Sequence, residues 1–413
     1  MAKAKPTPLY PTYAELKDFR FEEYPELKAF LESAEPWRLQ HWRWGQEFLQ
    51  YIGRNKSEHT YTRFRNEIER FLLWVFLFQS KPMDQFRKAD ILDYADFCWQ
   101  PPVSWICLAN HEKFLCQNGL HTQNPLWAPF KLKLPKRADN DVLADKKKYK
   151  PSQQTLTATF TAITVFYKYL MSEEYLYGNP AQIAKGDCRH FISDAQVKEV
   201  RRLSESQWQY VFDVAHTLAE EDDLYERSLF VICAMKTLFL RISELSERPN
   251  WSPIMSHFWE DSEGNWWLKA FGKGRKLRDI TVPNSFIPYL KRYRSYRGLS
   301  KLPSPGDNSP IVEKIRGQGG MTSRQLTRIV QQVFDKAYEE MRAAEGDDKA
   351  RKLKEASTHW LRHTGASMEI ERGRALKDLS EDLGHSSMAT TDTVYVQTEN
   401  RIRAESGKAR KVN

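Results

Sequence analysis

The spacing of apolar side chains predicts a mainly α-helical protein with one small antiparallel β-sheet. In the first half of the chain, apolar residues recur every three or four positions after Ser57 and again after Ser152, and a serine can cap a helix. The second half has helical spacing at residues 204–220, 225–240, 286–296, 322–343, 358–371 and 376–383. Between residues 254 and 282, short aromatic and β-branched runs separated by glycine and aspartate replace it, which is typical of a sheet with tight turns.

The same pattern predicts how the chain is divided. Residues 1–35 mix proline, tyrosine and charge, and we expect a partly ordered arm. Residues 36–190 form a helical domain, with a loop-like stretch at 126–149, and a linker follows it. Residues 198–413 form a second domain in which helices surround the sheet, ending in a basic tail.

Composition indicates a soluble protein with a polyanionic partner. The chain has 413 residues, of which 41% are hydrophobic and 28% charged, enough for two or three domains with sizeable cores. A formal net charge of +9 favours nucleic acid as a partner without proving it. The five cysteines are odd in number and contain no CxxC pair, which argues against a disulfide framework or a zinc ribbon. No secretory leader or membrane span is predicted, so we expect a cytoplasmic protein.

Residues 357–395 concentrate the groups suited to phosphodiester chemistry. They hold His359, Arg362, His363, His385 and Tyr395 among apolar positions. A guanidinium binds phosphate oxygens with a planar fork, an imidazole can transfer protons, and a phenol can act as a nucleophile. This stretch is therefore the centre of the predicted site.

A zinc site is the alternative for His359 and His363, which share one face of the predicted helix. Metalloproteases with two histidines at this spacing need a glutamate base, but residue 360 is Trp. Arg362 would also repel a metal ion from the same helix. We therefore predict no metal and no other cofactor.

Two earlier segments add charged candidates. Arg241 ends an apolar helix with Glu244 three residues on, and such a charge needs an ion partner or an anion. A purely structural Arg241–Glu244 pair is the alternative. Lys273 lies between Gly272 and Gly274 in a predicted β-turn, where it can protonate a leaving alkoxide or simply be solvated.

Four motifs together resemble the tyrosine recombinase, or phage integrase, family. They are L-F-L-R-I-S-E-L, G-K-G-R-K-L-R, H-W-L-R-H-T and L-G-H-S-S followed by T-T-D-T-V-Y, in this order between residues 238 and 395. The resemblance implies a helical core-binding domain that binds DNA and an α+β catalytic domain. It implies an enzyme that cuts and rejoins DNA strands without metal or ATP.

The resemblance also implies a role for each matching residue. Arg241 and Arg362 would bind the scissile phosphate, Tyr395 would attack it to form a 3′-phosphotyrosyl link, and Lys273 would protonate the leaving 5′-oxygen. The remaining three groups would assist, and these are His359 for proton transfer, His385 for a hydrogen bond to the phosphate and Glu244 for orienting Arg241 or His359. His363 would be structural.

Double-stranded DNA is the expected partner, and candidate contacts in the helical domain are Arg63, Arg65, Lys146, Lys147 and Lys148. These charges also fit an ordinary solvated face. The resemblance further implies a homotetramer on DNA at the bacterial nucleoid, with accessory DNA-bending or directionality proteins as further candidates. A type IB topoisomerase and a non-catalytic DNA-binding protein are the alternatives.

Overall fold

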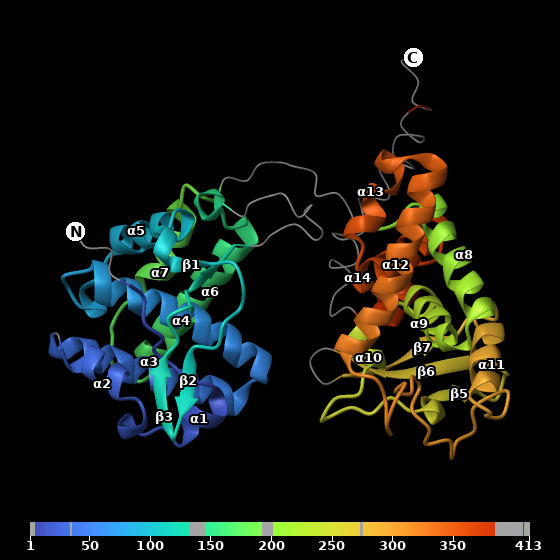
Figure 1. Ribbon diagram of the computed structural model, residues 1–413, viewed down its shortest axis with the longest axis horizontal. Helices are drawn as coiled ribbons and strands as arrows, with labels where there is room; N and C mark the ends of the chain where they lie inside the picture. Colours follow the sequence, from blue (N-terminus) through green and yellow to red (C-terminus); the bar gives the residue numbers. More distant parts are fainter. Residues whose placement is uncertain are drawn as a thin grey trace. The chain divides into compact units, whose positions relative to one another are not determined.

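A computed structural model describes residues 5–33, 35–132, 145–191, 201–272, 276–384 and 408. The chain divides into two compact units, Met1–Gln196 and Val197–Asn413. Figure 1 shows helices in both units and the small sheet in the second. The fold class is the predicted one, mainly α with small antiparallel sheets.

The first unit is a helical bundle. Its helices are α1 (Tyr13–Lys17), α2 (Pro25–Glu32), α3 (Pro36–Asn55), α4 (Glu58–Phe78), α5 (Lys88–Trp99), α6 (Gln153–Ser172) and α7 (Pro180–Asp187). The hydroxyls of Ser57 and Ser152 cap α4 and α6, as predicted, by accepting hydrogen bonds from the N–H groups of Thr60 and Thr155. Aromatic and aliphatic side chains of α3, α4 and α6 fill the core between them.

Residues 5–33 differ from the partly ordered arm that we predicted. Leu9, Tyr10 and Leu16 are fully buried in the core of the first unit. The buried carboxylate of Glu69 on α4 accepts hydrogen bonds from the N–H groups of Leu9 and Tyr10. Although this segment is rich in proline and lysine, burial of its apolar side chains is sufficient to hold it in place.

The domain predicted to be helical, residues 36–190, also contains a β-hairpin near residue 120. Strands β2 (Phe114–Gln117) and β3 (Leu120–Gln123) pair antiparallel through a turn at Asn118 and Gly119, whose φ angles are 50° and 79°. Asn-Gly is the preferred pair for such a turn, so the sequence did contain the signal. Two further short strands, β1 (Ile106–Cys107) and β4 (Phe130–Lys131), pair in parallel.

The second unit surrounds a three-stranded sheet with helices. The helices are α8 (Glu205–Glu221), α9 (Glu226–Thr237), α10 (Ile242–Leu245), α11 (Ile287–Tyr296), α12 (Ser323–Glu345), α13 (Asp347–Glu355), α14 (Thr358–Glu371) and α15 (Leu376–Leu383). The strands β5 (Phe258–Glu260), β6 (Trp266–Phe271) and β7 (Leu277–Thr281) are antiparallel in this order. The small antiparallel sheet is the predicted one.

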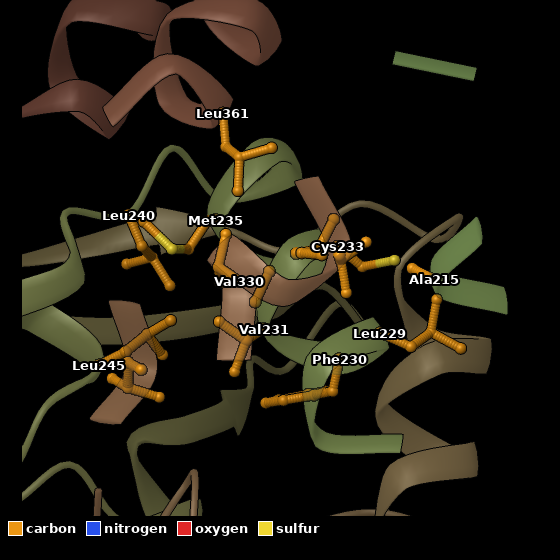
Figure 2. Close-up of a cluster of buried hydrophobic side chains, with 14 of the residues drawn as sticks. Ala215, Leu229, Phe230, Val231, Cys233, Met235, Leu240, Leu245, Val330 and Leu361 are labelled. Atoms are coloured by element: carbon orange, nitrogen blue, oxygen red, sulfur yellow. The ribbon is translucent and has the colours of Figure 1, made fainter. Parts of the chain in front are cut away.

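Helix α9 lies at the centre of the second unit. Its residues from Leu229 to Met235 are all buried, whichever side of the helix they occupy. Figure 2 shows its side chains between Ala215 of α8, Val330 of α12 and Leu361 of α14. A helix that is covered on all sides has little freedom to shift, so the segment that follows it is held rigidly.

None of the helices in the described residues is long and apolar enough to cross a membrane.

Candidate active site

Arg241 is held by the turn that follows α9. Phe239 adopts a left-handed conformation with φ of 51°, and its buried ring packs with α14 and α15. This conformation costs a non-glycine residue on the order of 1 kcal/mol, which the packing of the ring offsets. The chain reverses there, so that Arg241 precedes α10 with 25% of its side chain exposed.

Glu244 is the buried carboxylate of this site. Its side chain has no exposed surface and accepts hydrogen bonds from the Arg241 N–H at 2.8 Å and the Arg241 Nη1 at 3.0 Å. Arg278 on β7 donates two more, at 2.6 and 2.9 Å. Burial by itself raises the pKa of Glu244, but the hydrogen bonds and charges of these arginines outweigh it and hold the pKa below its usual value.

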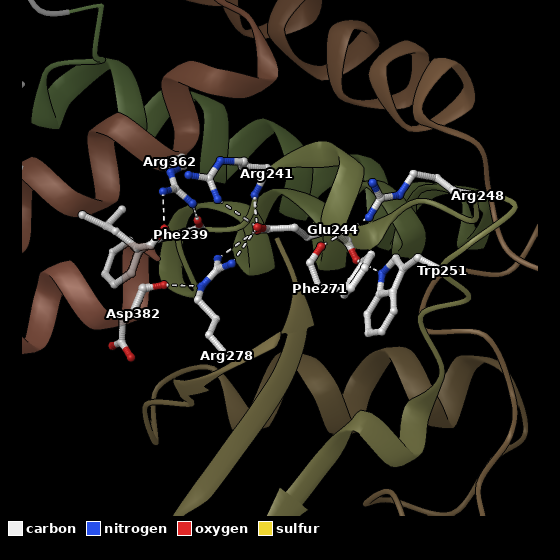
Figure 3. A network of polar contacts seen from close by, with 10 residues as sticks. Phe239, Arg241, Glu244, Arg248, Trp251, Phe271, Arg278, Arg362 and Asp382 are labelled. Carbon is white, nitrogen blue, oxygen red and sulfur yellow. Dashed lines mark hydrogen bonds and ion pairs between the residues drawn. The ribbon is translucent and has the colours of Figure 1, made fainter. Parts of the chain in front are cut away.

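Arg362 on α14 also lies beside the turn that holds Arg241 and Glu244. Its side chain is 1% exposed, and its two terminal nitrogens donate to the main-chain oxygens of Phe239 and Leu383, each at 2.5 Å. Figure 3 shows the Arg362 guanidinium beside that of Arg241. Arg362 therefore connects the turn after α9 with the end of α15.

We call Arg241, Arg278 and Arg362, together with Glu244, the arginine cluster. It brings three guanidinium groups around a single carboxylate. The excess of positive charge and the fork geometry of the guanidinium groups suit a phosphate or another oxyanion.

His359 lies at the edge of the arginine cluster. The surrounding protein removes part of the water from its ring, and the charges of Arg362 and Arg241 add to this effect, so that the pKa of His359 is lowered. The ring of His363 stacks edge-on against it at 4.3 Å between centroids. Among the residues that the structure describes, no group of three His, Cys, Asp or Glu side chains is arranged to hold a metal ion.

The end of α15 is attached to β7. The carboxylate of Asp382 accepts hydrogen bonds from the N–H and hydroxyl of Thr281 at 3.1 and 2.6 Å, and it forms an ion pair with Arg374. The main-chain oxygen of Asp382 accepts a hydrogen bond of 2.9 Å from the Arg278 Nε. The helix then ends at Gly384, which has a left-handed φ of 60°.

Three of the predicted site residues, Lys273, His385 and Tyr395, lie outside the described residues. The residues that precede two of them are described. The N–H of Gly272 donates to the Lys276 oxygen at 2.9 Å across the turn between β6 and β7, and Gly384 ends α15.

The predicted DNA contacts lie in the first unit, and two of them line one groove of about 880 Å³. Arg65 and Lys148 contribute to its walls, whereas Arg63, Lys146 and Lys147 do not. The other basic residues of the walls are Arg70, Lys113, Lys131 and Lys150, and the acidic ones are Glu15, Glu69 and Glu112. Arg63 and Lys147 are exposed and Lys146 is half-buried.

Sequence reasoning overlooked Arg278 and Asp382. Arg278 is the last residue of the G-K-G-R-K-L-R motif, and it occupies a core-facing position of β7 between the exposed residues 277 and 279. A charged residue at an inward position of a strand requires a buried partner. That alternation was the available signal, but it does not name Glu244 as the partner.

Comparison with known proteins gives a consistent result. The phage integrase family model matches residues 201–401. Tyrosine recombinase XerC of Thermodesulfovibrio yellowstonii is 25% identical over 252 residues, which cover 60% of this chain and 72% of that protein. Tyrosine recombinase XerC of Leptospira interrogans is 24% identical over 264 residues, covering 64% of this chain and 74% of that protein.

Solved structures share the fold. The XerH site-specific recombinase bound to palindromic difH substrate, a post-cleavage complex, aligns with a TM-score of 0.54 at 13% identity, covering 96% of this chain and 93% of that one. The Tn1549 transposon integrase in complex with transposon right end DNA aligns with a TM-score of 0.52 at 15% identity, covering 89% and 98%. Residues 201–401 therefore form a phage integrase family domain, and the relatives and solved structures support a site-specific recombinase of the tyrosine recombinase family.

Proposed function

We propose that this recombinase cuts and rejoins DNA through a 3′-phosphotyrosyl intermediate on Tyr395, without metal or ATP. The Tyr395 oxygen forms a bond to the scissile phosphorus, the bond from phosphorus to the 5′-oxygen breaks, and that oxygen leaves as a hydroxyl. The new ester keeps the energy of the phosphodiester, so a 5′-hydroxyl from another strand can reverse the step.

The arginine cluster is the observation that carries this proposal. Two guanidinium groups from different segments, Arg241 before α10 and Arg362 on α14, meet beside one buried carboxylate. Fixed donors aimed at a phosphate stabilise the charge that develops on its oxygens in the transition state. In this proposal they take the place of the divalent cation of a metal nuclease.

Proton transfer is assigned to the residues around that phosphate. Lys273 protonates the leaving 5′-oxygen. The lowered pKa of His359 favours a neutral imidazole near pH 7, which can accept the proton of the attacking phenol. His385 donates a hydrogen bond to the phosphate, Glu244 orients Arg241, and His363 supports the helix.

We assign DNA binding to both units. In the first, approximately residues 36–190 with Arg63, Arg65 and Lys146–Lys148 contact the DNA backbone, and in the second, residues 198–413 carry out the reaction. The DNA complexes of the XerH recombinase and of the Tn1549 integrase support DNA as the partner. We further propose a tetramer on two DNA sites, with accessory DNA-bending or directionality proteins as additional partners.

A trapping experiment tests the proposal. The full chain is incubated with the duplex DNA that flanks its gene, reactions are stopped with sodium dodecyl sulfate, and covalent protein–DNA complexes are isolated and sequenced. We expect the wild type to be trapped at one site on its 3′-phosphate side, with no requirement for divalent metal. Tyr395→Phe should bind the same DNA and form no complex.

The controls separate the alternatives. Tyr177→Phe removes a phenol that is 96% exposed in the first unit, and it should be trapped like the wild type. Trapping of Tyr395→Phe would assign the nucleophile to another residue. Relaxation of supercoiled plasmid at unrelated positions would favour a topoisomerase, and DNA binding without trapping by the wild type would favour a binding protein.

A further inference from the structure

We propose that Arg278 is a positioning residue that sets the active site of this recombinase by joining three of its segments. It would hold the Arg241 guanidinium through Glu244, and the end of α15 through the Asp382 main chain. This inference rests on the proposed function, because it assigns Arg278 a role in the same phosphodiester reaction.

The placement of Arg278 in the sheet supports this role. In the register of β6 and β7, Arg278 is paired with Ala270, which is 2% exposed, and Ile280 two residues on is fully buried. The side chain therefore starts on the core-facing side of the strand, and only 12% of it is exposed. A guanidinium at this position is unfavourable unless its donors are satisfied.

The Arg278 donors are satisfied by two different segments of the site. Both terminal nitrogens bind the two oxygens of Glu244 as a planar fork, and the Nε binds the main-chain oxygen of Asp382 (Figure 3). The planar geometry of the guanidinium fixes these two acceptors relative to each other. A displacement of either acceptor would therefore break a hydrogen bond.

Two glycines make room for this side chain. A Cβ atom placed on Gly272 would lie 3.0 Å from the Arg278 Nη1, and one on Gly384 would lie 2.8 Å from its Cδ. Gly272 directly precedes Lys273 in the chain, and Gly384 directly precedes His385. The side chain thus packs against the last described residue before each of these predicted catalytic residues.

Arg278 and Arg362 each bind a different main-chain oxygen at the end of α15. Arg278 binds the oxygen of residue 382, and Arg362 binds that of residue 383. These oxygens belong to the last turn of the helix, where main-chain acceptors lack partners within the helix. The proposed reaction assigns Arg362 to the phosphate on the basis of its motif. All three nitrogens of Arg278 are bound to Glu244 or Asp382, so we assign Arg278 a positioning role.

Arg278 also keeps Glu244 ionised. The charged groups that act on Glu244 are Arg241 from the same turn, Arg278 from β7 and Arg362 from α14. Burial opposes them, and Arg278 supplies the strongest opposing hydrogen bonds. Without Arg278 the pKa of Glu244 rises, and protonation of Glu244 would weaken its hydrogen bonds to Arg241.

The test is a single-turnover measurement of covalent complex formation, from pH 5.5 to 8.5, on the flanking-DNA site mapped by trapping. We expect Arg278→Ala to form the complex about 10- to 100-fold more slowly at pH 7.5, because a small displacement of reacting groups has an effect of this size. Its affinity for the DNA should be close to that of the wild type. Its rate should also fall more steeply toward acidic pH than the wild-type rate, in which only the protonation of His359 contributes.

Two further variants separate charge from geometry. Arg278→Lys keeps a cation beside Glu244, so the additional acidic loss should disappear. Its rate should remain below that of the wild type, because a single ammonium does not reproduce the fork to Glu244 together with the bond to Asp382. In the double variant Arg278→Ala with Glu244→Gln, the additional acidic loss should be absent because residue 244 no longer carries a carboxylate that can be protonated.

Arg292→Ala is the matched control for stability. Arg292 pairs with the nearly buried Glu226 in the same unit, away from the arginine cluster. If Arg278→Ala has the wild-type rate and pH profile, or is slowed only as much as Arg292→Ala with no additional acidic loss, the inference is wrong. If the wild type itself forms no covalent complex, the proposed function fails and the inference fails with it.

Discussion

Gly365 on α14 packs directly against the main chain of Lys236 on α9. A Cβ atom at residue 365 would lie 1.8 Å from the Lys236 oxygen, far inside the contact distance of the two atoms. The close approach places Arg362, one turn earlier on α14, beside the Phe239 oxygen in the turn after α9. The smallest possible side chain is thus a condition for the arginine cluster to assemble.

Gly365→Ala should therefore reduce both stability and activity. The methyl group must push α14 away from α9, and overpacking of this kind costs about 3 kcal/mol. The displacement carries Arg362 with it, so covalent complex formation should fall further than the loss of folded protein explains. Thermal unfolding and DNA trapping measure the two effects.

Ser367→Ala is the control for the same helix. Ser367 is fully buried, and its hydroxyl has no hydrogen-bond partner among the described residues. Its removal should leave stability and trapping close to the wild-type values. Wild-type behaviour of Gly365→Ala would show that α14 and α9 can separate without disturbing the cluster.

Arg241→Ala should lose catalysis and keep the fold. Its side chain is a quarter exposed, and Glu244 retains the two hydrogen bonds from Arg278 when it is removed. Loss of one fixed donor to a transition-state oxyanion lowers rates about 100- to 1,000-fold. Single-turnover trapping should show this loss while the melting temperature changes little. A large drop in melting temperature with an unchanged rate per folded molecule would indicate the structural Arg241–Glu244 pair instead.

His41 makes the first unit sensitive to acid. It is 1% exposed, its Nδ1 has no hydrogen-bond partner within the described part of the chain, and burial lowers its pKa to about 3. Because the unfolded chain binds a proton near pH 6.5 and the folded chain does not, stability falls as the pH drops from about 6.5 toward about 3. This group contributes a slope of about 1.4 kcal/mol per pH unit over that window.

His41→Phe should remove that part of the acid sensitivity. The phenylalanine ring can replace the aromatic contacts that the His41 ring makes with Trp37 and Trp44, and it has no proton to bind. Urea unfolding of the full chain at several pH values between 4 and 7 measures the slope. The exposed His59, changed to Gln, should leave the wild-type slope in place. An unchanged slope in His41→Phe would mean that His41 is protonated in the folded protein.

If the groove of the first unit binds DNA, its basic residues should contribute to the salt dependence of DNA affinity. If Arg65 and Lys148 contact DNA phosphates, the double change to Gln should weaken binding on all sequences, because such contacts carry no base specificity. The slope of log affinity against log salt should decrease by about 0.9 for each phosphate that the protein no longer neutralises. Lys185→Gln, an exposed lysine on α7 outside the groove, is the control. Equal slopes for the wild type and the double variant would show that this groove is not part of the DNA-binding surface.

The main features of the fold could be predicted because they depend on local pattern. Three- and four-residue spacing marked the helices, and short runs between glycines marked the sheet of the second unit. The hairpin at Asn118–Gly119 had an equally local signal that we missed. The packing of Leu9 and Tyr10 in the core had no such local signal, since it depends on the fit of these side chains to α3 and α4.

The sequence by itself determined which residues are the candidates for the chemistry, because motif order and residue type are properties of the chain. It identified Arg241, Glu244 and Arg362 before any geometry was known. Only the tertiary structure decided how they are held, through the left-handed turn at Phe239, the contact of Gly365 with α9 and the fork of Arg278. Each of these joins segments distant in the chain, and such contacts follow from the packing of a complete core, which local spacing does not encode.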